Sequence, residues 1–175
     1  VHASLIYKLG ESLIADEVTA LSELIKNAYD ADAKFCSLTI DTNYEEIINE
    51  ISCRGKIELA DNGCGMDLQT IVNGWLTLSN SPKKRMKKEK KTTPKYHRYP
   101  LGDKGLGRLS VQKLGRYMQM ITKSENSYIE YTVTIPWGDF LKNTTIDQIP
   151  VTINERSVED SKSYTRIVIK DLINS

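Results

Sequence analysis

Apolar residues at helical spacing predict an amphipathic helix over residues 15–30. Its apolar positions recur every three or four residues: Val18, Leu21, Ile25 and Ala28, with Leu24 beside them. At about 100° per residue, Glu23, Asn27 and Asp30 fall within about 60° of one another, on the side away from the first two apolar positions. The helix is therefore predicted to present these three polar side chains together.

Short apolar or alternating runs predict strands along the rest of the chain. The predicted strands cover residues 34–41, 55–60, 116–123, 127–135 and 164–171, with a hairpin turn at Glu125 and Asn126. Further helices are predicted over 67–76, with Asp67 as N-cap, and over 106–114. Residues 138–162 show no clear pattern. This order favours an α+β fold, with an antiparallel or mixed sheet covered on one face by helices, over a doubly wound parallel sheet.

Residues 79–104 interrupt the apolar pattern and are rich in Ser, Pro, Lys and Thr. A loop of this length inside a compact domain is usually a functional lid or a disordered segment. Its central part, residues 83–98, carries nine basic side chains and one acidic one, whereas the whole chain has a net charge of only +1. The positive charge is therefore concentrated in this one segment, and the rest of the chain is mildly acidic.

Length and composition predict one ordinary globular domain over residues 1–175, as the N-terminal part of a longer protein. No apolar run approaches the roughly 18 residues of a membrane span, and no signal peptide is visible, so no membrane partner is expected. The three cysteines show no CxxC spacing, which disfavours a disulfide framework or a zinc site and favours a reducing, cytoplasmic location.

The predicted helix over 15–30 places an acid and an amide on one face. Side chains at i and i+4 of a helix point into the same volume, as Glu23 and Asn27 do. An amide oxygen is a hard ligand that suits Mg²⁺, which takes few protein ligands and relies on phosphate oxygens and water. A carboxylate one turn earlier is suited to orient a water molecule or take its proton. Taken alone, the pair also fits a solvated helix face.

A second motif follows the predicted strand over 55–60. The strand stops at Asp61, and the glycines at 63 and 65 allow positive φ or close approach of a ligand. A buried carboxylate there can accept a hydrogen bond from the exocyclic amine of adenine. Guanine has no amine at that position, and a mismatch of this kind costs about 1–3 kcal/mol. The alternative is an ordinary strand end followed by an Asp-Asn-Gly turn.

A third motif, LGDKGLGR over residues 101–108, leads from the basic loop into a predicted helix. Glycines and free amides at a helix start form an anion site, to which Lys104 would add positive charge. The pattern lacks both the spacing of a P-loop and the strand-first context of a dinucleotide fold, so by itself it is weak.

Together, in this order and element context, the motifs resemble the GHKL ATPase superfamily of type II topoisomerases, heat-shock chaperones, histidine kinases and MutL proteins. A fourth element matches as well, a late strand that carries Thr165 within residues 163–172. The resemblance covers about residues 12–115 and 163–172. It implies a two-layer α/β sandwich of Bergerat type, with a mixed, mostly antiparallel sheet, helices on one face and a long ATP lid at about 77–107. The residues that carry the resemblance are Glu23, Asn27, Asp30, Asp61, Gly63, Gly65, Gly102, Gly105 and Gly107.

The resemblance also implies roles for single residues. Glu23 would activate the attacking water, Asn27 would bind Mg²⁺, and Asp61 would bind the adenine amine of ATP or ADP, with Thr165 in support through water. Asp30 would contact the nucleotide region or hold the helix end. The other nucleotide-binding residues would shape the adenine pocket or cap the phosphates: Gly63, Gly65, Met66, Gly102, Lys104, Gly105, Leu106 and Gly107.

Within the superfamily, NAYDAD from residue 27 and DNGCGM from residue 61 look more like the MutL, MORC and chaperone branch than the histidine kinases. That branch implies Mg-ATP binding and hydrolysis that drive lid closure and ATP-dependent homodimerisation of a larger protein. Because a lysine from a following domain often completes such sites, weak turnover is expected of this chain alone. The alternatives are a histidine kinase catalytic domain that passes the γ-phosphate to a partner histidine, and a nucleotide-gated interaction or nucleic-acid-binding module without turnover.

The basic segment 83–98 also has alternative readings. It fits a solvated loop, a phosphate clamp through Lys83 or Lys104, or a salt-sensitive contact with nucleic acid. Only Tyr96 and Tyr99 are interleaved with its charges as candidates for base stacking.

Overall fold

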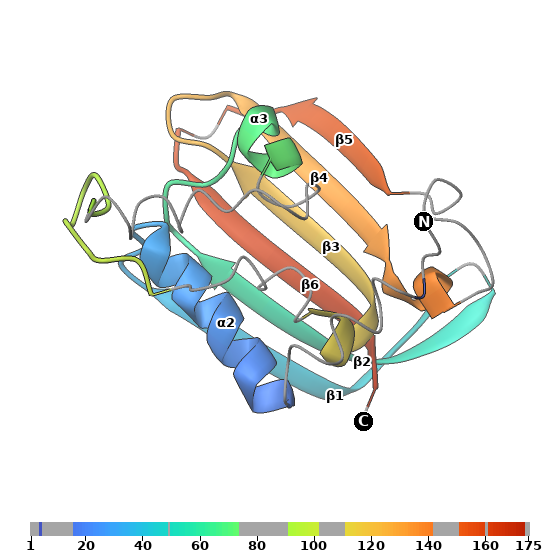
Figure 1. Ribbon diagram of the computed structural model, residues 1–175. Helices are drawn as coiled ribbons and strands as arrows, with labels where there is room; N and C mark the ends of the chain where they lie inside the picture. Colours follow the sequence, from blue (N-terminus) through green and yellow to red (C-terminus); the bar gives the residue numbers. More distant parts are fainter. Residues whose placement is uncertain are drawn as a thin grey trace.

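A six-stranded antiparallel sheet forms one layer of the protein (Figure 1). The computed structural model describes residues 4, 16–48, 50–73, 91–101, 111–141, 151–159 and 161–173. The strand order is β1-β2-β6-β3-β4-β5, and every pairing between these strands is antiparallel, so the sheet is not mixed. The strands are β1 (Cys36–Ile48), β2 (Ile51–Asp61), β3 (Gly115–Lys123), β4 (Ile129–Pro136), β5 (Thr152–Ser157) and β6 (Tyr164–Leu172).

The helices lie on one face of this sheet and form the second layer, which confirms the predicted two-layer α+β fold (Figure 1). They are α2 (Glu17–Asp30), α3 (Leu68–Ile71) and the short 3-10 helices η2 (Val111–Lys113) and η3 (Trp137–Leu141). The core lies between the layers, where Leu24 of α2 is buried together with Leu59 of β2, Met120 of β3 and Ile167 of β6. No helix in the described part of the chain is long and apolar enough to cross a membrane.

Helix α2 forms where the apolar spacing predicts it, but its buried positions agree only in part with the predicted ones. Asp16 caps the helix by accepting a hydrogen bond from Thr19 N. The buried residues are Ala20, Leu24 and Ala28, whereas Val18 and Ile25 are 73% and 44% exposed. The small side chains of Ala20 and Ala28 let the helix lie close to the sheet. Side-chain size therefore decides which of two neighbouring rows of apolar residues on the helix is buried. The predicted buried positions at 18 and 25 are therefore wrong.

Several other elements differ from the predicted ones in extent. Strand β1 continues to Ile48 beyond an irregularity between Asp41 and Glu45, and β2 begins at Ile51. Strand β5 lies in the stretch without a clear pattern, because it is an edge strand whose side chains are mostly exposed. Helix α3 follows Asp67, whose carboxylate accepts from Thr70 N as an N-cap. The first part of the helix predicted over 106–114, residues 106–110, lies outside the described part of the chain. The described part of this prediction contains only the short 3-10 helix η2.

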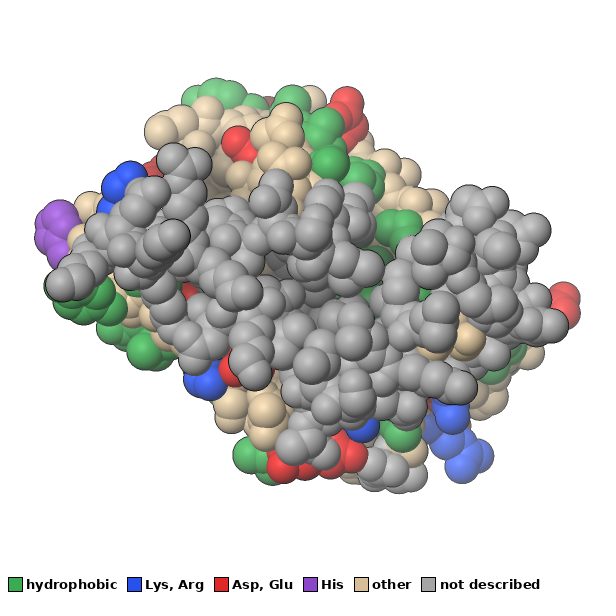
Figure 2. All heavy atoms as spheres, viewed as in Figure 1, with side chains coloured by type: hydrophobic (Ala, Val, Ile, Leu, Met, Phe, Trp, Pro, Cys, Tyr) green, Lys and Arg blue, Asp and Glu red, His purple; other side chains and the backbone are tan. Residues whose placement is uncertain are grey.

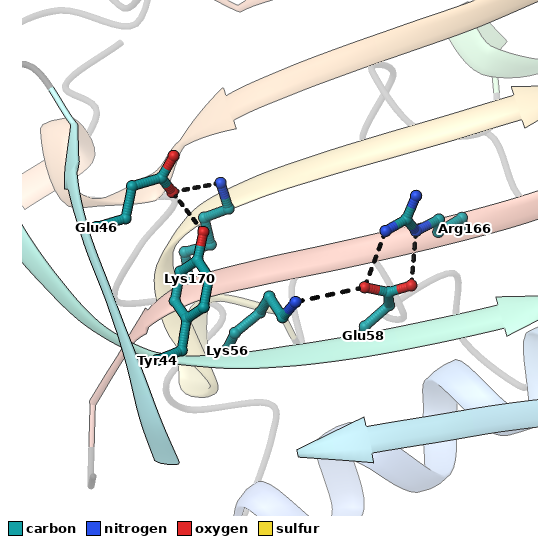
Figure 3. A network of polar contacts seen from close by, with 6 residues as sticks. All are labelled: Tyr44, Glu46, Lys56, Glu58, Arg166 and Lys170. Carbon is teal, nitrogen blue, oxygen red and sulfur yellow. Dashed lines mark hydrogen bonds and ion pairs between the residues drawn. The ribbon is translucent and has the colours of Figure 1, made fainter. Parts of the chain in front are cut away.

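The opposite face of the sheet is polar (Figure 3). Glu58 of β2 pairs with Arg166 of β6 through two contacts of 2.7 and 3.0 Å, and Lys56 Nζ lies 3.8 Å from the same carboxylate. Glu46 binds Tyr44 and Lys170 nearby. Two carboxylates pair here with three basic side chains, as on the solvated face of an antiparallel sheet. Asp61 and Thr165, in contrast, lie on the helix side.

Candidate functional site

Asp61, the last residue of β2, is a buried carboxylate on the helix side of the sheet. It is 8% exposed and lies directly across from Thr165 of β6, in register with it. Leu59 and Ile167, two residues away on the same strands, belong to the core, so Asp61 and Thr165 face the same layer as α2. Burial raises the pKa of Asp61, against the opposing effect of its hydrogen bond from Gly63 N.

A small hydroxyl cluster surrounds Thr165. Its Oγ1 lies 3.0 Å from Oγ1 of Thr122 on β3. The Thr122 hydroxyl oxygen also accepts from Met66 N at 3.0 Å and lies 3.0 Å from the carbonyl oxygen of Tyr164. Thr122 thus ties Met66 to the residue opposite Asp61, a role that the sequence analysis missed. The sequence feature that could have indicated this role is the position of Thr122 on the buried face of β3, two residues after Met120.

Gly63 and Gly65 are required by close packing of the turn after Asp61. A Cβ on Gly63 would lie 2.6 Å from Ala31 O at the end of α2, and one on Gly65 would lie 1.9 Å from Lys123 O of β3. Gly65 also has φ +64°, in the left-handed region. The turn is pinned by Cys64 N, which donates to Ala31 O at 2.8 Å. Both glycines therefore have a structural reason, independent of any ligand.

The three polar residues of α2 lie on the flank of its buried stripe and are half-buried. Lys26 Nζ lies 2.8 Å from Glu23 Oε1, in an ion pair whose side chains are 41% and 20% exposed respectively. Asp30 Oδ1 accepts from Leu101 N at 2.8 Å. Asp30, at the end of α2, thus binds the residue directly before Gly102, and its two predicted roles stay predictions. A half-exposed pair such as Lys26–Glu23 contributes little stability, about 0–1 kcal/mol, so it opens readily.

Several predicted site residues lie outside the described part of the chain. They are Gly102, Lys104, Gly105, Leu106 and Gly107, together with Lys83, and of the lid predicted at about 77–107 only residues 91–101 are described. Within the described ranges, no group of three or more His, Cys, Asp or Glu side chains is arranged to hold a metal ion.

The GHKL resemblance depends on a buried carboxylate at a strand end. This carboxylate lies opposite a threonine of the neighbouring strand, and a glycine turn follows it beneath the polar flank of a helix. A family model described as histidine kinase-, DNA gyrase B-, and HSP90-like ATPase matches residues 16–165. The chain belongs to this family. Membership supports nucleotide binding in general, and it includes the whole stretch from the N-cap of α2 to Thr165.

The fold of this ATPase domain also occurs among solved structures. The ATPase region of Saccharomyces cerevisiae topoisomerase II matches 88% of the chain with a TM-score of 0.53 and 16% sequence identity. At this identity the likeness shows the fold alone. The chain spans 37% of the length of that topoisomerase structure. No individual curated protein sequence matches the chain.

Proposed function

We propose that this ATPase-family domain binds Mg-ATP with Asp61 at the adenine and hydrolyses it with Glu23. The observation that carries the proposal is Asp61 itself. Burying an ionised carboxylate is costly unless donors surround it. A carboxylate accepts about four hydrogen bonds, and Gly63 N provides one. A perturbed carboxyl group at the end of a central strand is therefore well suited to take a ligand donor, such as the adenine amine.

The other residues have complementary roles in this proposal. The Thr165 hydroxyl, held by Thr122, would bind a water molecule that also contacts the base. The Asn27 amide oxygen would hold Mg²⁺, which neutralises charge on the phosphates. The Glu23 carboxylate, released from Lys26, would orient the attacking water and take its proton. Residues 102–107 would contact the phosphates, as their sequence predicts.

Two further parts of the proposal concern the larger protein. In the branch that the motifs resemble, ATP closes the lid and brings two copies together, and we infer the same use of ATP here. A histidine kinase catalytic domain is the alternative. The two differ in where the γ-phosphate goes, because hydrolysis releases inorganic phosphate whereas a kinase leaves the label on a protein histidine.

Nucleic-acid binding through the basic segment 83–98 stays a prediction. One of its nine basic residues, Arg98, is already used inside the protein. Its guanidinium donates to the carbonyl oxygens of Tyr29 and Ala33 at 3.1 and 2.9 Å and lies over the Tyr29 and Tyr96 rings. These contacts favour a structural role for Arg98 and Tyr96 over a contact with nucleic acid.

Asp61→Asn is expected to weaken ATP binding about tenfold to a hundredfold. The amide oxygen of asparagine keeps the hydrogen bond from Gly63 N, so its NH₂ group faces the adenine amine. Both of these groups are donors, and the hydrogen bond to the base is lost. Because an ionised buried carboxylate is removed, the melting temperature of the ligand-free protein should stay level or rise. Isothermal titration and thermal melting measure both effects. Asp41→Asn on the edge strand β1, where Asp41 accepts from Asn43 N, is the matched control. Unchanged ATP affinity in Asp61→Asn would refute the assignment.

ATP affinity is expected to fall on acidification at a higher pH than for an ordinary aspartate. The pKa of Asp61 is raised above its usual 3.8, mainly by burial. The ionised form accepts more strongly from the adenine amine than the protonated form, so affinity is highest above the raised pKa and falls as pH falls through it. The stability of the ligand-free fold has the opposite sign, since protonating Asp61 favours the folded state. Titrations at several pH values in which Asp61→Asn shows the same acid loss as the wild type would contradict this prediction.

A further inference from the structure

Asn62, the residue directly after Asp61, joins the end of β2 to the start of β1. Its side-chain oxygen Oδ1 accepts from Lys34 N at 2.9 Å and from Phe35 N at 3.1 Å. Strand β2 ends at Asp61, which pairs with Cys36, so these two amides lie just beyond the paired part of the strands. The Asn62 side chain therefore satisfies two backbone donors that the sheet itself leaves without a strand partner.

The turn that receives these bonds, residues 31–35, is held by a second set of contacts. It follows the C-terminal end of α2, at the left of Figure 1, and the same side of Figure 2 shows hydrophobic and basic side chains mixed at the surface. The buried Asp32 carboxylate accepts from the Thr93 hydroxyl at 2.5 Å. The Arg98 guanidinium donates to Ala33 O at 2.9 Å. The turn therefore has a fixed position at this end of the molecule.

Asn62 also comes directly before the amide whose hydrogen bond Asp61 accepts. Gly63 N donates to Asp61 Oδ1 at 2.8 Å, so the orientation of the peptide between residues 62 and 63 decides how well this N–H points at the carboxylate. Beyond that peptide, Cys64 N donates to Ala31 O at 2.8 Å. The peptide is thus held on one side by the Asn62 side chain and on the other by the turn after α2.

We propose that Asn62 is a positioning residue for the adenine base. By binding the start of β1, its side chain fixes the peptide whose N–H points at Asp61, and with it the direction in which the carboxylate faces the base. This role rests on the proposed function, since it matters to binding only if Asp61 receives the adenine amine. Asn62 acts through Asp61 and not through a contact of its own with the nucleotide.

The test compares ATP with adenosine, which lacks phosphates, in the variant Asn62→Ala. The affinities for both ligands should fall by the same factor, about twofold to tenfold, because the disturbed carboxylate faces the base that they share. Asn62→Ser, whose shorter side chain cannot reach both amides, should give a smaller effect of the same kind and serves if Asn62→Ala does not fold. Isothermal titration measures ATP affinity, and ligand-detected NMR measures adenosine affinity.

The pH dependence of binding separates positioning from a purely structural role. The hydrogen bond from Gly63 N lowers the pKa of Asp61 against the larger effect of burial, so a misaligned N–H lets this pKa rise further. The pH at which ATP affinity falls on acidification should therefore be higher in Asn62→Ala than in the wild type. Two thiols interact with Asp61, those of Cys36 and Cys64, but burial raises the pKa of both, so they stay neutral in this range.

Asp16→Ala is the matched control. The Asp16 side chain also accepts from a backbone amide, Thr19 N at 2.7 Å, but it does so at the N-terminal end of α2, whereas the turn 31–35 follows the C-terminal end. Losing this cap should lower the melting temperature, as losing the Asn62 bonds does. The affinities for ATP and adenosine and the pH dependence of ATP binding should stay those of the wild type.

Each other outcome has a distinct meaning. A folded Asn62→Ala protein with a lower melting temperature but wild-type affinities would show a merely structural role and overturn the inference. Loss of ATP affinity alone, or loss of both affinities with an unchanged pH dependence, would overturn it as well. A wild-type chain that binds neither ligand, or an Asp61→Asn variant that binds ATP as the wild type does, would instead refute the proposed function, and the positioning role with it.

Discussion

Glu23→Gln is expected to slow ATP hydrolysis about 10²- to 10⁴-fold, the usual contribution of a positioned general base. Glutamine keeps the size of the side chain and its place on the half-buried flank of α2, but it cannot take a proton from water. ATP affinity should change less than about twofold, because a group that acts on the attacking water contributes to the transition state and little to the ground state. The rate is best measured in single turnovers with excess protein, since slow turnover is expected of this chain.

Two comparisons make this experiment specific. Glu17→Gln, in the exposed first turn of the same helix, should leave both rate and affinity unchanged. Lys26→Met removes the cation that lies 2.8 Å from Glu23 Oε1 and should not slow hydrolysis if the carboxylate is the acting group. Turnover equal to the wild type in Glu23→Gln would exclude Glu23 as the base. Following γ-labelled phosphate also tests the kinase alternative, because label retained on a partner protein would show phosphotransfer.

The fold could be predicted from the sequence where local chemistry decides it. The N-cap at Asp67 and the hairpin turn at Asn126, which has φ 63°, depend on neighbouring residues only. The antiparallel two-layer class follows from the order of elements. In contrast, the choice between two adjacent stripes of α2 depends on how closely the helix approaches the sheet. Spacing alone included Val18 and Ile25, whereas the structure buries Ala20, which the predicted positions left out.

The candidate site shows the same limit. Asp61 and Thr165 are recognisable because each ends or begins a strand within a motif, and the structure places them opposite each other. Thr122 belongs to no motif, and it matters only because β3 lies beside β6. Asp32 binds Thr93, 61 residues further along, and Arg98 binds Ala33, 65 residues before it, although Arg98 belongs to a basic run that resembles a solvated loop. Long-range contacts of this kind leave no local periodic signal.

Gly65→Ala is expected to lower the free energy of unfolding by about 2–5 kcal/mol, which combines the left-handed backbone cost with the cost of overpacking. The added methyl group would lie 1.9 Å from Lys123 O and 2.6 Å from Lys123 C, both rigid backbone atoms in β3. Neither neighbour can rotate away, so the turn itself must shift. A change of this size is a large part of the stability of a typical domain, about 5–15 kcal/mol. Denaturant unfolding of the ligand-free protein measures it.

Gly138→Ala is the matched control, because the three atoms nearest to its added methyl group all belong to the Arg116 side chain, at 3.4 to 3.8 Å. That contact is ordinary packing, so the control should stay within about 1 kcal/mol of the wild type. The comparison also separates the two reasons for a glycine in this motif. If Gly65 were required only by the nucleotide, Gly65→Ala would lose ATP affinity and keep its stability. We expect both to fall, since moving the turn away from Lys123 also moves Met66, whose amide is bound to Thr122 beside Thr165. The glycine turn is thus first required by the packing of the fold, and the proposed geometry for binding the base depends on it.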